Sequence, residues 1–301
     1  MPVAHAPSRT LALLAVAGIG AYSLQRYFSR TALAESPQEP PVYFGGGGMN
    51  LTSLRLYSVQ IVNHNTKRLL FELPDKDARC GLSLTSALLT ITRPKGRWLP
   101  VIRPYTPIND FREPGFIELM VKKYPNGKAS SHLHSLEPGQ SVTFAGTIKG
   151  FPWSPNKFSH VYLLAGGAGI TPIYQLIQGV LNNPEEKTKM TLIFGVNTEQ
   201  DLVLRDELDD FKKRFPDRFN VVYTVSDPSK TADGSSSPSN PSYKQGRITE
   251  SLLKEVMKGP DEKGIKIFVC GPPAMEASLT GYRNQGILGK LGYRKDHIHK
   301  F

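Results

Sequence analysis

Two patterns of hydrophobic and polar positions divide the chain. From about Leu51, short segments alternate apolar and polar residues and are separated by turns rich in Pro, Gly, Asn and Asp. After about Phe158 the apolar segments become continuous and alternate with segments of helical period. Alternation with a period of two predicts half-buried antiparallel strands, whereas continuous apolar strands between helices predict a parallel sheet covered on both faces. We therefore expect an antiparallel β-barrel or sandwich followed by a parallel-sheet α/β domain.

The same pattern predicts the individual elements. The strands expected in the first domain are Leu54–Asn63, Leu69–Leu73, Leu88–Thr92, Phe116–Lys123 and Ser141–Ala145. The strands expected in the second are His160–Ala165, Met190–Val196, Phe219–Val225 and Lys266–Cys270, and its helices are Pro172–Leu181, Leu204–Phe215, Thr249–Met257 and Ala274–Gly286. An insert rich in Ser, Pro, Gly and Asp, Asp227–Ser242, predicts a mobile surface loop.

The first 34 residues are expected to lie outside the fold. Leu11–Tyr22 is apolar throughout, arginines flank it, and no acidic residue precedes Glu35. Three interpretations stay open: a cleavable secretory signal ending near Ala32-Leu33-Ala34, an organelle-targeting segment, or a retained membrane anchor. A buried core helix is disfavoured because a Pro/Gly-rich linker follows. The expected domains are residues 1–34 (targeting or anchor segment), 35–50 (linker), 51–155 (β-barrel) and 156–301 (α/β domain).

Composition narrows the class of protein. The chain has 301 residues, 39% hydrophobic and 21% charged, which excludes a fibrous repeat, a disordered chain and a polytopic membrane protein. Its 37 Lys and Arg against 26 Asp and Glu give a net charge of +11. This charge suits nucleic acid, an anionic membrane surface or an acidic protein, but it is scattered and no nucleic-acid-binding motif accompanies it. We expect no nucleic acid partner and favour an acidic protein.

Two cysteines exclude a disulfide scaffold and a four-cysteine metal site. Free thiols are favoured, and a single disulfide stays open. His132 and His134 flank Leu133, but surface or packing roles are favoured over a metal pair, and no metal is expected.

Two glycine-rich corners follow buried strands in the second domain. Gly166-Gly167-Ala168-Gly169-Ile170-Thr171-Pro172 lies between a strand and a helix, where free backbone N–H groups attract phosphate. Cys270-Gly271-Pro272-Pro273-Ala274-Met275 follows the last of the expected strands, and ligands of α/β sheets bind at such carboxyl ends. A plain tight turn is the alternative for the first corner. Cys270 could equally be a small buried residue without a chemical role, since no neighbouring residue in the sequence indicates an activated nucleophile.

The first domain carries two further candidate stretches. Arg103-Pro104-Tyr105-Thr106-Pro107 offers a guanidinium for phosphate, a flat ring and a hydroxyl on a segment that its prolines hold extended. Gly127-Lys128-Ala129-Ser130 follows Val121–Tyr124, and backbone amides at a helix start there suit a pyrophosphate. A structured loop between strands is the alternative for the Arg103 stretch.

These four motifs, R-P-Y-T-P, G-K-x-S, G-G-x-G-I-T-P and C-G-P-P-x-M, occur in an order and spacing that resemble the ferredoxin–NADP reductase superfamily. The branch they resemble most is that of the NADH–cytochrome b5 reductases, and the resemblance covers about residues 51–301. It implies that the β-barrel binds FAD and the α/β domain binds NADH. It also implies hydride transfer from NADH to FAD, followed by single-electron transfer to the haem of cytochrome b5 or a similar acidic haem protein. Nothing in the sequence indicates an assembly larger than a monomer.

The resemblance also implies roles for residues. The residues implied to contact FAD are Arg103, Pro104, Tyr105, Thr106, Val121, Tyr124 and Thr171, with Phe301 beside the flavin and Gly127, Lys128, Ala129 and Ser130 at its pyrophosphate. Those implied to lie around NADH are Lys122, Gly167, Gly169, Cys270, Gly271, Pro272 and Met275. The catalytic candidates are Thr106, near the reactive flavin nitrogen, Thr171 and Cys270.

Some positions depart from the family pattern. Ala129 replaces a common Met and Ala168 a common Thr, both at positions that act mainly through the backbone. Ser226 stands where the family often has an acid that binds the ribose of NADH, and Asp227 comes one residue later. NADH is expected over NADPH.

The N-terminus resembles that of fungal mitochondrial forms, which implies the mitochondrial outer membrane and the intermembrane space; the endoplasmic reticulum is the alternative. Two competing functions stay open. One is a related reductase module of the nitrate-reductase or oxygenase type with another electron acceptor. The other is a membrane-tethered flavin- or nucleotide-binding sensor without turnover.

Overall fold

The computed structural model describes residues 40–44, 51–96, 98–228 and 242–301. The expected N-terminal segment, most of the linker and most of the loop Asp227–Ser242 lie outside the described residues. Residues from Pro41 to Phe301 form one compact unit. The domain boundaries given above stay predictions, although every strand up to residue 148 belongs to one sheet and every strand from residue 160 onward to another.

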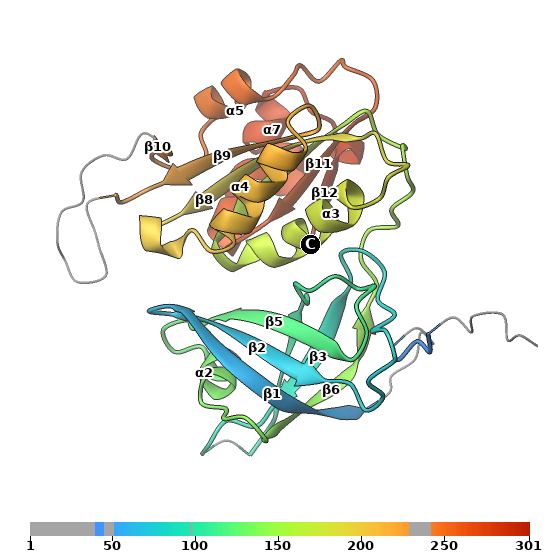
Figure 1. The fold of residues 1–301 in the computed structure, drawn as a ribbon. Helices are drawn as coiled ribbons and strands as arrows, with labels where there is room; N and C mark the ends of the chain where they lie inside the picture. Colours follow the sequence, from blue (N-terminus) through green and yellow to red (C-terminus); the bar gives the residue numbers. More distant parts are fainter. Residues whose placement is uncertain (1–39, 45–50, 97, 229–241) are drawn as a thin grey trace, which may run out of the picture. The chain divides into compact units, whose positions relative to one another are not determined.

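The first sheet is antiparallel and has six strands in the order β4-β3-β6-β1-β2-β5 (Figure 1). The strands are β1 (Thr52–Asn63), β2 (Thr66–Glu72), β3 (Ala87–Thr92), β4 (Val101–Tyr105), β5 (Phe116–Lys122) and β6 (Ser141–Ile148). Helix α2 (Lys128–His134) contacts β3 and both end strands, β4 and β5. The alternating pattern puts Leu54 and Leu56 in the core while Arg55 stays exposed, and Phe71 meets Phe144 edge to face at 5.4 Å between ring centroids. The antiparallel β domain is thus confirmed.

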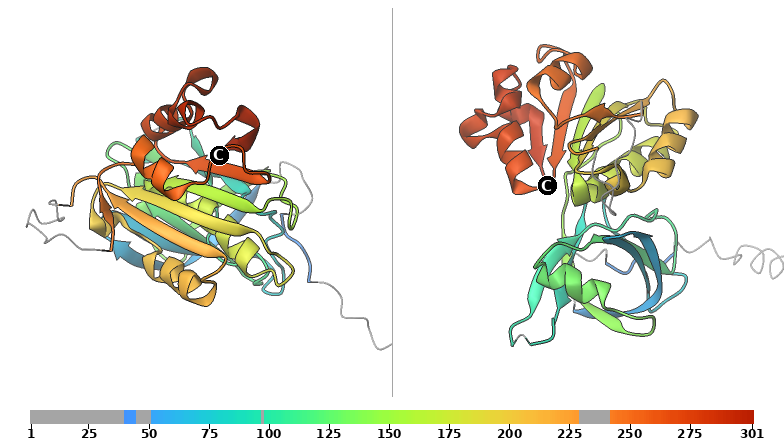
Figure 2. Two further views of the ribbon diagram at one scale, coloured as in Figure 1. Left: turned by 90° about the horizontal axis from the view of Figure 1, so that it is seen from above. Right: turned by 90° about the vertical axis from the view of Figure 1, so that its left-hand side faces the viewer.

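The second sheet is parallel throughout and has the order β10-β9-β8-β7-β11-β12. Its strands are β7 (His160–Gly166), β8 (Lys189–Val196), β9 (Phe219–Val225), β10 (Lys244–Gln245), β11 (Ile265–Cys270) and β12 (Ile298–Lys300). Its helices are α3 (Ile170–Leu181), α4 (Arg205–Arg214), α5 (Glu250–Val256), α6 (Pro273–Thr280) and α7 (Ile287–Lys290). Helices cover both faces of this sheet (Figure 2). The expected α/β domain is confirmed.

Two separate apolar clusters form because the strands of this sheet are apolar on both sides. Val161 and Leu163 of β7 pack in the cluster that includes α3 and α4. Tyr162 and Leu164 of the same strand pack in the cluster that includes α5, α6 and α7. Continuous apolar strands therefore have the two-sided burial that the sequence pattern predicted.

The order in which strands are added to the sheet changes direction at β7. The connection through α3 leads to β8 on one side, whereas β11 pairs with β7 on the other. The two glycine-rich corners follow β7 and β11, so they lie side by side at the carboxyl edge, where α/β sheets bind ligands. A Cβ atom on Gly169 would lie 2.2 Å from the carbonyl oxygen of Cys270, so only glycine permits this close approach.

The last helix is shorter than the sequence suggested. The expected helix Ala274–Gly286 is wrong beyond Thr280, where α6 ends. Gly281 has φ +61° and ψ 173°, a conformation that ends a helix and that residues with a side chain avoid. Strands β4, β10 and β12 were not expected. Strands β10 and β12 have only two or three residues, which carry too little periodicity to be recognised. The Arg103 stretch, for which a loop between strands was the alternative, lies in β4 as far as Tyr105.

We predict that Gly281→Ala destabilises the fold by at least ~2 kcal/mol. The backbone conformation alone costs a residue with a side chain about 1–3 kcal/mol. In addition, the new Cβ would lie 2.3 Å from the backbone nitrogen of Gly286. Urea unfolding measures the effect, and Gly259→Ala is the matched control, since a Cβ there meets nothing within 4 Å. Equal stability of the two variants would contradict this account of the helix end.

Candidate functional site

A cleft of about 1060 Å³ is lined by residues of both the β domain and the α/β domain. It brings together most of the residues singled out in the sequence. The ones that line it are Arg103, Pro104, Tyr105, Thr106, Lys122, Tyr124, Gly127, Lys128, Ala129, Ser130, Gly169, Thr171, Cys270, Gly271, Pro272 and Phe301. They come from five separate stretches of the sequence, which the fold brings together at one site.

Strand β4 supplies the first wall of the cleft. It pairs only with β3, and such an end strand tolerates Pro104, which has no N–H to donate to a second neighbour. Arg103 is exposed, and Thr106 is buried just beyond the strand. Burial raises the pKa of Tyr105 to about 12, although the nearby Arg103 acts in the opposite sense. The wall thus presents a cation, a neutral phenol and a hydroxyl in close succession.

The start of α2 supplies the second stretch. The Ser130 hydroxyl donates to the carbonyl oxygen of Gly127 at 3.2 Å and accepts from the backbone N–H of Tyr124 at 3.2 Å. A Cβ on Gly127 would lie 2.4 Å from the Ser130 hydroxyl oxygen, so this tight turn needs glycine. The first N–H groups of a helix have no partner within the helix. Lys128 and Ala129, which begin α2, line the cleft, and a helix start of this kind is suited to phosphate oxygens.

The two glycine corners supply the opposite wall. Gly167, with φ +51°, begins a short 3₁₀ turn that leads into α3, and the Thr171 hydroxyl donates to the carbonyl oxygen of Ala168 at 3.3 Å. Burial, together with the carboxylate of Glu276, raises the pKa of Cys270 to about 12. The Cys270 thiol therefore stays protonated at neutral pH, and it forms a neutral surface rather than a thiolate nucleophile.

The C-terminus closes one end of the cleft. Strand β12 pairs with β11, and the backbone N–H of Phe301 donates to the carbonyl oxygen of Val269 at 3.2 Å. The Phe301 ring stacks on Phe268 with 5.8 Å between centroids. The terminal ring is thus held at the cleft by the parallel sheet itself.

The charge of the cleft is one-sided. Five cationic side chains line it, those of Arg103, Lys122, Lys128, Lys149 and Lys300, against the single carboxylate of Glu276 among the described lining residues. The rings of Tyr105, Tyr124 and Phe301 line it as well. Cations and backbone N–H groups bind the pyrophosphate of a dinucleotide, and flat aromatic rings stack on its planar ring systems. The residues present therefore fit FAD and NADH.

Three of the predicted residues do not line this cleft. Val121 is fully buried in the core of the β domain, between two neighbours that do line it, Met120 and Lys122. Gly167 lines a smaller adjoining cavity. The sulfur of Met275 packs against Gly166 at the first glycine-rich corner. A Cβ on Gly166 would lie 2.4 Å from this sulfur.

Several residues of the cleft carried no signal in the sequence. Thr85 has φ +64°, and its hydroxyl accepts from the backbone N–H of Phe151 at 2.9 Å. A Cβ on Gly150 would lie 2.1 Å from that hydroxyl oxygen. Glu276 accepts from the backbone N–H of Gly271 at 3.3 Å. The spacing around the second corner could have indicated Glu276, one turn into α6, but the contact between Thr85 and Gly150 depends on chain folding alone.

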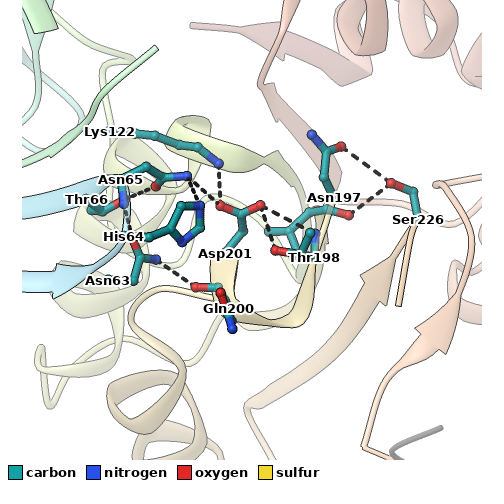
Figure 3. A network of polar contacts seen from close by, with 11 residues as sticks. Asn63, His64, Asn65, Thr66, Lys122, Asn197, Thr198, Gln200, Asp201 and Ser226 are labelled. Carbon is teal, nitrogen blue, oxygen red and sulfur yellow. Dashed lines mark hydrogen bonds and ion pairs between the residues drawn. The ribbon is translucent and has the colours of Figure 1, made fainter. Parts of the chain in front are cut away.

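A buried carboxylate joins the two domains beside the cleft (Figure 3). Asp201, only 6% exposed, follows β8 and accepts from the Lys122 ammonium at 2.7 Å and from the Asn65 amide at 3.1 Å. It also accepts from the Thr198 hydroxyl at 3.1 Å, which orients it from its own domain. Burial alone would raise the pKa of Asp201, but these hydrogen bonds and the charge of Lys122 hold it below its usual value. We call Asn65, Lys122, Thr198 and Asp201 the domain clamp.

Other contacts support the clamp. The Asn63 amide donates to the carbonyl oxygen of Gln200 at 2.7 Å, and the Gln175 amide on α3 donates to that of Asn109 at 2.5 Å. Arg68 of β2 forms an ion pair with Glu207 of α4. These bonds cross from one domain to the other and add to the contact that the clamp makes.

We predict that Asp201→Asn destabilises the compact unit by about 1–3 kcal/mol, because it leaves the Lys122 ammonium without its anion. The effect depends on pH. A depressed pKa means that the carboxylate stabilises the fold above about pH 4, and this stabilisation is lost as the pH falls through the depressed value. The difference between wild type and variant in urea unfolding should therefore shrink below pH 4.

The matched control is Asp210→Asn, which removes an exposed ion pair with Arg214 on α4. Such pairs contribute about 0–1 kcal/mol. If Asp201→Asn costs no more than this control at pH 7, the clamp does not hold the two domains.

Comparisons with known proteins agree with this geometry. The family described as "Oxidoreductase FAD-binding domain" matches residues 53–153, and the family described as "Oxidoreductase NAD-binding domain" matches residues 163–280. The chain is 45% identical to NADH-cytochrome b5 reductase 2 of Emericella nidulans over 296 residues, which cover 96% of this chain and 88% of that protein. It is 44% identical to NADH-cytochrome b5 reductase 2 of Aspergillus fumigatus over 292 residues, 94% of this chain and 86% of that one.

Among solved structures, the fold is similar to the cytochrome b5 reductase domain of Ulva prolifera nitrate reductase. The TM-score is 0.73 at 27% sequence identity, and the match covers 84% of this chain and 97% of that domain.

Proposed function

The chain belongs to the NADH-cytochrome b5 reductase family, and from this premise we propose how its cleft, its surface charge and its N-terminus serve that activity. It is an FAD-dependent oxidoreductase that transfers electrons from NADH to cytochrome b5. The observation that carries the assignment is a single cleft in which the β4 and α2 stretches face the two glycine corners. An FAD wall and a nicotinamide-nucleotide wall meet there.

Bound FAD supplies the chemistry, since it accepts a hydride from NADH and releases two electrons one at a time. The protein holds and orients both cofactors. Arg103 and the N–H groups at the start of α2 would hold the FAD phosphates, and Tyr105 and Tyr124 would contact its ring system. Thr106 and Thr171 would supply hydroxyls from the two domains to the reacting rings. Phe301 would exclude water from the nicotinamide side.

The glycine corners admit the nicotinamide nucleotide. Gly167, Gly169 and Gly271 carry no side chain, which leaves backbone room for its phosphates and its ring. Cys270, a neutral thiol, and Pro272 would offer the nicotinamide an apolar surface. The chemistry that the two cofactors would supply, hydride transfer, requires no acid–base pair from the protein.

The electron acceptor is a negatively charged haem protein of the cytochrome b5 type. The net charge of +11 attracts such a partner, and lysines at the mouth of the cleft, Lys128, Lys149 and Lys300, put that attraction near the flavin. Its reduction should slow as ionic strength rises, because salt screens this attraction. The enzyme acts as a monomer.

The N-terminal segment ties the enzyme to a membrane. No helix among the described residues is long and apolar enough to cross a bilayer. The apolar run Leu11–Tyr22, with arginines on both sides and no acid, is the part of the sequence that suits a membrane anchor or a targeting signal. The resemblance of this segment to that of fungal mitochondrial forms leads us to propose the mitochondrial outer membrane, with the intermembrane space as a second location and the endoplasmic reticulum as the alternative.

The nucleotide preference rests on the carboxyl end of β9. There the backbone N–H of Ser226 donates to the carbonyl oxygen of Val196 at 3.0 Å, and that of Asp227 to Asn197 at 2.8 Å. Asp227 therefore lies at the ligand-binding edge, where a carboxylate binds ribose hydroxyls and repels a 2′-phosphate.

We predict that Asp227→Asn lowers the preference for NADH over NADPH by roughly ten-fold, the effect of about 1.4 kcal/mol of electrostatic discrimination. The measurement is the ratio of kcat/KM for the two nucleotides. Asp217→Asn, at an exposed carboxylate before β9, serves as the control. An unchanged ratio in the Asp227 variant would assign the selection to another residue.

The assigned activity is tested by spectroscopy of the purified full-length protein. We expect a yellow protein with a flavin spectrum, bleached by NADH under anaerobic conditions and recoloured by oxidised cytochrome b5. Bleaching without recolouring by cytochrome b5 would indicate another acceptor, as in the related reductase modules. A flavin that NADH does not bleach would indicate a sensor, and a colourless protein that takes up no FAD would contradict the function altogether.

A further inference from the structure

The loop between β3 and β4 exposes two large apolar side chains next to each other. Trp98 is 96% exposed and Leu99 is 60% exposed. The other tryptophan, Trp153, is half-buried, donates to Glu186 at 3.1 Å and packs on Phe268. Monomeric proteins rarely leave so large a side chain without contacts, and contiguous exposed apolar residues mark interaction sites.

The surroundings of this apolar pair are cationic. Arg93 and Lys95 are exposed in the same loop, and the sequence holds no Asp or Glu between Asp77 and Asp110. Pro94 and Gly96, which has φ +75°, form a turn in the described part of this loop. None of these four loop side chains lines the cleft.

This combination of side chains is typical of a surface that binds the headgroup region of an anionic bilayer. It consists of a tryptophan and a leucine beside two cations, with no acid in the same stretch of sequence. Tryptophan concentrates at the level of lipid headgroups because its ring is amphipathic, and each nearby Lys or Arg adds attraction to anionic lipid. An acidic protein would pair with the cations but would leave the apolar pair without an evident partner. The lysines that suit such a protein are found at the cleft.

We propose that Trp98 and Leu99 insert into the headgroup region of an anionic membrane while Arg93 and Lys95 bind lipid phosphates. This contact goes beyond the electron-transfer function and needs only a bilayer, whatever the N-terminal segment does. It gives the catalytic body a second attachment to the membrane and so restricts its orientation there.

The test uses the FAD-loaded full-length protein with vesicles, because the chain has only two tryptophans. Trp153→Phe leaves Trp98 as the sole reporter. We expect vesicles of phosphatidylcholine and phosphatidylserine to shift Trp98 emission to shorter wavelength, and brominated lipid to quench it. Vesicles of phosphatidylcholine alone should have little effect. In the Arg93→Gln/Lys95→Gln variant, the affinity for the anionic vesicles should fall roughly five-fold for each cation removed.

Trp98→Phe, which leaves Trp153 as reporter, is the control and should show no quenching. Flavin absorbance checks that each variant is folded, and the readout is independent of turnover, so a failure here is distinguishable from failure of the reductase activity. The proposal is overturned if Trp98 ignores anionic vesicles or responds equally to neutral ones. It is also overturned if the emission of Trp98 changes only when cytochrome b5 is added, only when the protein concentration is raised, or only when FAD is removed.

Discussion

A carboxylate that is removed from water needs donors to replace the water, and Asp201 takes them from both domains. Lys122 and Asn65 come from the β domain, and Thr198 comes from its own. Because the charge is almost fully buried, the carboxylate is poorly satisfied unless the two domains meet in this one arrangement. The width of the cleft, and with it the meeting of two cofactors, depends on this contact.

The clamp also explains why the cleft can be cationic without pulling the domains apart. Five cations line it, and their mutual repulsion is reduced at Lys122, which is paired with Asp201. Of the other four, Arg103 suits the phosphates of FAD, whereas Lys128, Lys149 and Lys300 suit an acidic protein partner. Glu276 is the exception, and its carboxylate is engaged by the backbone N–H of Gly271. The distribution of charge thus follows from which groups the fold pairs internally and which it leaves for ligands.

The sequence alone predicted the two sheets because their patterns differ in kind, alternating in one and continuous in the other. It also located the corners at Gly169 and Cys270, since each follows a buried strand with glycines that let a ligand approach the backbone. The clamp could not be predicted in this way. Lys122 and Asp201 are 79 residues apart, and Asp201 by itself reads only as part of a capping box with Thr198. Lys122 was expected to reach toward the nicotinamide nucleotide, whereas in the structure its ammonium is bonded to Asp201.

The clamp is necessary for the reaction between the two walls and not for either wall alone. The most direct measurement is the stopped-flow rate at which NADH bleaches the flavin of Asp201→Asn under anaerobic conditions, compared with Asp210→Asn. We expect a rate about ten-fold lower, since a small misplacement of reacting groups costs at least this much, with the flavin content unchanged. A bleaching rate equal to that of the control would show that the walls meet without the clamp and would contradict this role of Asp201.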